Sequence, residues 1–128
     1  MTKWLSSEWF DRTRALAADQ PEYAGLSARV QYEVTGGPDG GAHYYWVLVD
    51  GHLTDSSSGT VGEPDVTLTM AWDDAVAVQQ GNLDPSVAFM QGRMKVVGSM
   101  GVLLALLPVA STGAYRDLRH RIAELTEF

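Results

Sequence analysis

Ser99 and three histidines are the residues of this chain whose types could support catalysis. Ser99 lies in the stretch GSMG (98–101), which is similar to the Gly-x-Ser-x-Gly turn of a serine nucleophile but lacks one residue on its N-terminal side. Such a nucleophile needs a neighbouring base, whereas His43, His52 and His120 are scattered along the chain. We therefore predict that Ser99 caps a helix beginning near residue 100, and that the chain has no catalytic residue.

Phosphate and metal chemistry also find little support in the sequence. A phosphate-binding loop needs several backbone N–H groups at a helix start, usually with a lysine or a Gly-x-Gly-x-x-Gly run, but only Gly98 and Gly101 are present here. The histidines lack a His-x-x-x-His spacing and the chain has no cysteine, so we expect neither a metal site nor a cofactor. An enzyme acting on an apolar substrate stays an alternative, in which Asp73 or Asp74 would pair with a histidine.

Composition narrows the classes of partner. The 128 residues fit a single domain, and the formal net charge of −7 disfavours binding to nucleic acid, because like charges repel. The longest apolar run, residues 102–107, is far shorter than the roughly 20 residues of a membrane span, so we expect no stable membrane insertion. The N-terminal residues lack the apolar core of a signal peptide. We therefore expect one domain, residues 1–128, in the cytoplasm.

The elements that position these residues follow from periodicity and turn signals. Ser6 or Ser7 begins a helix that ends before Pro21. Alternating side chains predict strands at 26–35 and 66–70, an apolar run at 44–49 predicts an interior strand, and the polar stretch 52–57 predicts an edge strand. Short helices at 72–80 and 85–91 precede a short strand, an apolar helix and a last helix from Ser111 or Thr112. This order predicts an α+β fold with a mostly antiparallel sheet and helices on one face.

The helix that begins near Met100 is apolar around almost its whole circumference. Residues 100, 103, 104 and 107 form one apolar stripe and residues 102, 106 and 109 form another. Such a helix must be covered on all sides, by the sheet and by a further helix, a partner subunit or a bound apolar molecule. The spacing alone favours a central core helix over the wall of a ligand site.

Three stretches resemble the sterol carrier protein family of lipid-binding domains. They are DVTLT (65–69), GNLDP (81–85) and AFMQGRMKVVGSMG (88–101), in the order and spacing of that family, and WVLVDG (46–51) fits it more loosely. The resemblance implies a five-stranded sheet backed by helices, with an apolar tunnel that takes fatty acyl chains, acyl-CoA or sterol-like molecules. It supplies no catalytic residues. Pro108 departs from the family pattern, and we expect it to cut the apolar helix short.

The resemblance makes a non-enzymatic lipid carrier the favoured function. The expected ligand-binding residues are Trp46, Phe89, Met90, Gln91, Met94, Met100, Leu103, Leu104 and Leu107. Core packing explains the apolar ones equally well, and Gln91 either orients a headgroup or faces water. The alternative function is a module that forms a homodimer or supports a lipid-metabolising enzyme through its apolar helix.

The last helix carries a cluster of basic side chains. Arg116, Arg119 and His120 share one side of it and could meet an anionic lipid head. However, the i,i+4 pairs Asp117/Arg121 and His120/Glu124 are typical of an ordinary solvated helix. The spacing favours this second interpretation.

Overall fold

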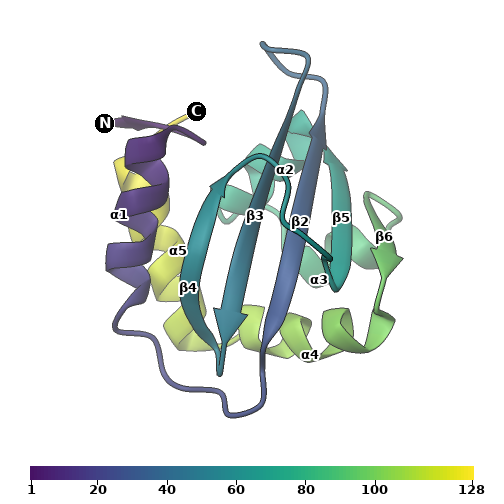
Figure 1. The fold of residues 1–128 in the computed structure, drawn as a ribbon. Helices are drawn as coiled ribbons and strands as arrows, with labels where there is room; N and C mark the ends of the chain where they lie inside the picture. Colours follow the sequence, from purple (N-terminus) through teal and green to yellow (C-terminus); the bar gives the residue numbers. More distant parts are fainter.

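The computed structural model describes residues 1–128 as an α+β fold in which helices lie against one face of a five-stranded sheet (Figure 1). The strands of this sheet are β2 (Ala28–Thr35), β3 (Gly41–Val49), β4 (His52–Ser58), β5 (Val66–Ala71) and β6 (Met94–Gly98). The helices are α1 (Ser7–Ala17), α2 (Trp72–Gln79), α3 (Pro85–Met90), α4 (Met100–Ala110) and α5 (Gly113–Leu125), and the short strands β1 (Thr2–Lys3) and β7 (Thr126–Glu127) pair with each other. The predicted fold class is confirmed.

The sheet has the order β4-β3-β2-β5-β6. Its pairs are antiparallel except β2 with β5, which is parallel, so the sheet is mixed and mostly antiparallel. The parallel pair arises because residues 59–65, the crossing segment, carry the chain from β4 across the sheet to the start of β5 (Figure 1). The apolar strand β3 is interior and the polar strand β4 lies at an edge, as their sequences predict.

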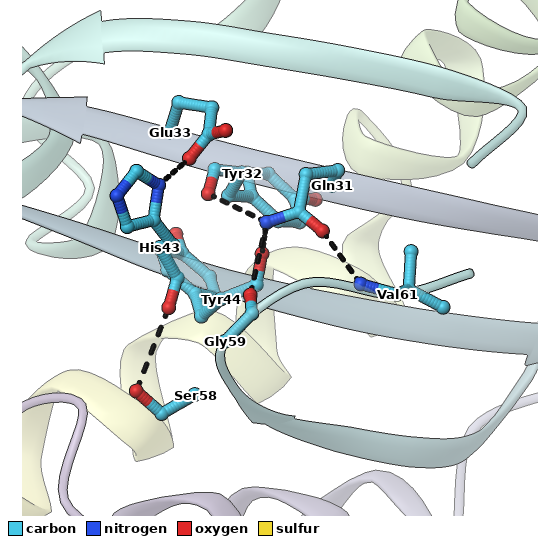
Figure 2. A network of polar contacts seen from close by, with 8 residues as sticks. All are labelled: Gln31, Tyr32, Glu33, His43, Tyr44, Ser58, Gly59 and Val61. Atoms are coloured by element: carbon cyan, nitrogen blue, oxygen red, sulfur yellow. Dashed lines mark hydrogen bonds and ion pairs between the residues drawn. The ribbon is translucent and has the colours of Figure 1, made fainter. Parts of the chain in front are cut away.

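Gln31 fixes the crossing segment to the outer face of the sheet. Its side chain is only 3% exposed although it points away from the helices. Nε2 donates to the backbone oxygens of Tyr44 (3.1 Å) and Gly59 (3.0 Å), and Oε1 accepts from the backbone nitrogen of Val61 (2.9 Å), as Figure 2 shows. A buried amide with all of these partners costs little to desolvate. The crossing segment is thereby held in place, together with the start of β5.

The helices cover the inner face of the sheet. Period-two alternation points Val30 and Tyr32 of β2 inward, and the register places Trp46 and Tyr44 beside them on β3. Tyr32 and Tyr44 stack with ring centroids 4.7 Å apart, and Phe10 of α1 packs on Tyr44. In Figure 1, α2, α3 and α4 lie behind the sheet, while α1 and α5 stand together beside β4. The core therefore lies between this face and the helices.

Polar caps begin four of the helices at the residues that the sequence indicates. Ser6, Asp84, Ser99 and Thr112 each accept a hydrogen bond from a free backbone N–H of the first turn. The Ser99 hydroxyl lies 3.1 Å from the nitrogen of Val102, which confirms its predicted role as a cap. These local bonds fix where α4 and α5 start.

The expectation that Pro108 cuts the apolar helix short was wrong, because α4 continues to Ala110. Proline removes one backbone donor, and in the last turn this frees only the carbonyl of the exposed Leu104. The helix ends in a tighter turn. The backbone nitrogens of Ser111 and Thr112 donate to the carbonyls three residues earlier, Pro108 and Val109, each at 3.1 Å.

The ends of the chain meet and anchor α5. β1 pairs with β7 in parallel, and the N and C termini lie together in Figure 1. Trp9 of α1 donates from Nε1 to the hydroxyl of Thr126 at 2.8 Å, and both side chains are buried. The last helix is therefore part of the folded domain rather than an appendage.

Candidate ligand-binding cavity

An apolar cavity of about 130 Å³, partly open to solvent, lies between the sheet and the helices. Of the 25 residues that line it, 21 are hydrophobic and none is charged. The sheet contributes side chains that include Val30, Tyr32, Trp46, Leu68 and Met94, and the helices contribute side chains that include Val78, Leu103, Leu107, Tyr115 and Leu118. The arrangement can hold an uncharged, apolar group away from water.

Helical spacing brings α4 to the cavity along one stripe. Leu103 and Leu107 are four residues apart and therefore lie one above the other, and Leu106 lies beside them. Leu103 is only 1% exposed and is the one side chain of α4 that is fully buried. The remainder of α4 is less enclosed.

The structure brings together four of the nine expected ligand-binding residues. Trp46, Met94, Leu103 and Leu107 line the cavity. The other five lie outside this lining: Phe89 is half-buried against the core, and Met90, Gln91, Met100 and Leu104 are exposed.

The elements of this chain leave one side of α4 uncovered, so full cover of its apolar circumference would require a partner or a bound apolar molecule. Leu104 is 57% exposed and Met100 is 45% exposed, although the sheet, α3 and α5 all contact α4. Met90 of α3 and Val97 of β6 are also exposed, at 76% and 70%. We call these four side chains the exposed apolar surface.

Sequence reasoning missed several residues of the lining. Tyr32, Tyr115 and Leu118 were not among the expected ligand-binding residues, and all three border the cavity. Their alternation or helical spacing signals that they point inward. The same spacing does not tell whether an inward side chain meets another side chain or empty space, so the sequence offered no signal for this distinction.

Burial keeps the phenols of the cavity neutral. Desolvation raises the pKa of Tyr32 and Tyr44 well above that of an exposed tyrosine. The pKa of Tyr115 is also raised by desolvation, although the Arg119 charge opposes that shift. The indole nitrogen of Trp46 is buried without a hydrogen-bond partner. The cavity is thus uncharged at neutral pH and offers only neutral polar groups.

The residues considered for catalysis do not meet at the cavity. His43 pairs with Glu33 on the outer face of the sheet (Figure 2), and His120 pairs with Glu124 on α5. Asp73 and Asp74 do not line the cavity either. No three histidine, aspartate or glutamate side chains gather as they would around a metal ion.

No helix has the length and apolar character needed to cross a bilayer.

Comparison with known proteins identifies relatives of this fold. Residues 10–111 match the model of the SCP-2 sterol transfer family. The chain is 35% identical over 80 residues to sterol carrier protein 2 of Rattus norvegicus and 37% identical over 82 residues to hydroxysteroid dehydrogenase-like protein 2 of Bos taurus. Each match covers 59% of this chain but only 14% and 18% of those proteins, so the chain corresponds to a small part of their length.

Solved structures with similar folds cover most of the chain. A crystal structure of sterol carrier protein 2 aligns with a TM-score of 0.71 and 18% identity over 95% of this chain and 98% of that one. The solution structure of palmitated SCP2L2 from Aedes aegypti aligns with a TM-score of 0.62 and 20% identity over 82% of this chain and 89% of that one. At these identities the structural likeness concerns the fold alone, whereas the family match extends over most of the sequence. The chain therefore belongs to the SCP-2 sterol transfer family.

Proposed function

We propose that this chain is a non-enzymatic carrier that holds one hydrophobic ligand, such as a fatty acid, acyl-CoA or sterol-like lipid, in the cavity between the sheet and the helices. The observation that carries the proposal is the uncharged, predominantly apolar lining of the cavity. The family match supports it, as does the fold shared with a protein solved in palmitated form. The residues that could act as acid or base lie elsewhere, which favours carriage over catalysis.

The expected affinity follows from the apolar surface of the ligand that the cavity shields from water. Shielding about 400 Å² at roughly 25 cal/mol/Å² yields about 10 kcal/mol gross. Immobilising the ligand costs several kcal/mol of this, which leaves a dissociation constant on the order of micromolar. A carrier with this affinity can also release its ligand.

The cavity must widen to admit such a ligand. Its volume of about 130 Å³ is close to the roughly 150 Å³ of a protein cavity that accepts benzene. A fatty acyl chain has more than twice the carbon atoms of benzene. We propose that α4 moves, because it buries only one side chain fully and has water on its outer side.

We assign the ligand contacts accordingly. Trp46, Met94, Leu103 and Leu107 line the cavity and would contact the apolar body of the ligand. Of the five other expected residues, Phe89, Met90, Gln91 and Met100 lie on or beside α3 and α4, and we propose that they form the rim that the ligand passes. Leu104 faces water and is assigned no contact. The carrier would act as a single domain in the cytoplasm, and the absence of cysteine suits a reducing compartment.

Titration with a fluorescent fatty acid tests this function. We expect saturable binding of one probe per chain and displacement of the probe by unlabelled dodecanoate. Lack of saturable binding by both acyl and sterol probes would contradict the proposal.

The exposed apolar surface favours a second candidate function, an association module. Met90, Val97, Met100 and Leu104 would bury their side chains against a second copy of the chain or a lipid-metabolising enzyme. Sedimentation over a range of concentrations tests the first of these. The association function predicts that the mass of the native chain rises toward that of a dimer with concentration, while the Leu104→Lys variant stays a monomer. This result would favour association over carriage if neither protein takes up lipid.

A further inference from the structure

A second hollow, of about 350 Å³, adjoins the cavity and is lined by no hydrophobic residue. We call it the polar pocket. Gln80, Gly81 and Asp84 contribute to it from the connection between α2 and α3, and Arg116, Arg119 and His120 contribute from α5. The family match ends at residue 111, so the α5 residues lie outside the region to which that match applies.

The polar pocket and the apolar cavity share a boundary. Gln79 lines the cavity and its neighbour Gln80 lines the polar pocket. Likewise, Pro85 lines the cavity and its neighbour Asp84 lines the polar pocket. On α5, Tyr115 and Leu118 line the cavity, while the residues that directly follow them line the polar pocket. A molecule with an apolar body and a polar head therefore finds both environments within the length of one amphiphile.

The arginines of the polar pocket have unused binding capacity. Four of the seven arginines lie within 4.0 Å of a carboxylate, and Arg29 donates to the backbone oxygen of Gly62. Arg116 and Arg119 have no such partner. Moreover, Nη1 of Arg119 is buried and makes no hydrogen bond, which is costly for a charged group. Nε of Arg121 is likewise buried without a hydrogen bond but lies 3.2 Å from the Asp117 carboxylate, whereas Arg119 has no carboxylate within 4.0 Å.

The neighbours of Arg119 place its guanidinium near the boundary between the polar pocket and the cavity. Its guanidinium lies 5.9 Å from the centre of the Tyr115 ring, and that ring lines the cavity. The one carboxylate of the polar pocket, Asp84, is occupied as a helix cap, since it accepts from the nitrogen of Ser86 at 2.8 Å. His120 faces Glu124 at 3.0 Å, so this pair contributes no net positive charge. Two arginines against one occupied carboxylate leave the polar pocket with an excess of positive charge in a chain of net charge −7.

We propose that the polar pocket binds the anionic headgroup of an amphiphile whose apolar body occupies the cavity, with Arg119 as the main contact and Arg116 as the second. This assignment rests on the proposed carrier function and names its ligand class as single-chain amphiphiles with an oxyanion head. A guanidinium donates in parallel to two oxygens of a carboxylate, phosphate or sulfate, so the shared chemistry is an anionic oxygen pair.

Three ligands of equal chain length test the proposal: dodecanoate, dodecyl phosphate and dodecan-1-ol. We expect the native chain to bind at least one of the two anions about tenfold or more tightly than the alcohol, which is the scale of one charge-assisted contact. Arg119→Gln removes the charge of the main contact and should reduce this preference several-fold, with Arg116 retaining the remainder, while binding of the alcohol changes by less than about twofold. Arg119→Lys, which keeps the charge, should retain more of the preference than Arg119→Gln. Whichever anion binds more tightly identifies the oxyanion.

Arg121→Gln is the matched control, because Arg121 lies on the same helix, pairs with Asp117 and does not line the polar pocket. Its affinities should equal those of the native chain. If the native chain binds the alcohol as tightly as both anions, or if Arg119→Gln keeps the full preference, the polar pocket is not a headgroup site and the carrier function still stands. If none of the three ligands binds, the headgroup site is refuted, and the carrier function is refuted with it if a sterol probe also fails to bind.

Discussion

Leu107→Trp should block the cavity and weaken lipid binding without unfolding the chain. Leu107 lines the cavity and is half-buried, so an indole at this position projects into an open volume of about 130 Å³. Benzene fills a cavity of about 150 Å³, and indole is larger than benzene, so the indole occupies most of the space. Excluding only two methylene groups of a ligand costs about 1.6 kcal/mol, or roughly fifteenfold in Kd. We therefore expect dodecanoate binding to weaken by about tenfold or more.

The same substitution reports on packing. Overfilling a solid core lowers the free energy of unfolding by about 1 to 3 kcal/mol. Because the indole enters an open volume instead, we expect a loss below about 2 kcal/mol. Urea unfolding of the ligand-free chain and probe displacement together measure both effects. Leu104→Trp is the control, because Leu104 is 57% exposed and lies outside the lining. Equal binding by both variants would refute the cavity as the ligand site, and unfolding of Leu107→Trp would refute the open volume.

Three further results are expected. Ser99→Ala removes the cap bond to Val102 and should cost about 1 kcal/mol in urea unfolding; a hydrolase activity lost in that variant would contradict the cap. Gln31→Leu leaves the partners of a buried amide unpaired and should cost about 1 to 3 kcal/mol, and an unchanged stability would show that the crossing segment does not depend on it. Because burial raises the folded-state pKa of Tyr32, Tyr44 and Tyr115, the unfolded chain loses these protons first, so stability should fall as pH rises above about 10. Absorbance titration of the phenols at alkaline pH checks this; ionisation of all five tyrosines near pH 10 in the folded chain would contradict it.

Local chemistry explains why most elements could be predicted. The caps at Asp84 and Ser99 use a side chain and a backbone N–H two or three residues away, so the sequence contains both partners. Strand alternation likewise depends on neighbouring residues. The effect of Pro108 was mispredicted because it depends on its place in the helix. Within the last turn, the loss of one backbone N–H donor does not end the helix. The family resemblance added the number of strands in the sheet, whereas their order became known only from the structure.

The candidate site was harder to predict because it depends on contacts between distant segments. The spacing of α4 shows an apolar helix, but only the packed fold shows that Leu103 faces the cavity and Leu104 faces water. The i,i+4 pairs of α5 form as predicted, yet they do not reveal that Arg119 lies beside Asp84 and Gly81 in the polar pocket. Those residues are more than thirty positions apart in the sequence.

Isotope-filtered NMR of the chain with bound dodecanoate tests the central claim most directly, because it reports which protein protons lie close to the acyl chain. Carriage in the cavity predicts nuclear Overhauser contacts from the acyl methylenes to Trp46, Leu103 and Leu107, and none to Leu104. Contacts confined to Leu104 and the rest of the exposed apolar surface would contradict it and place the lipid on the outside of α4.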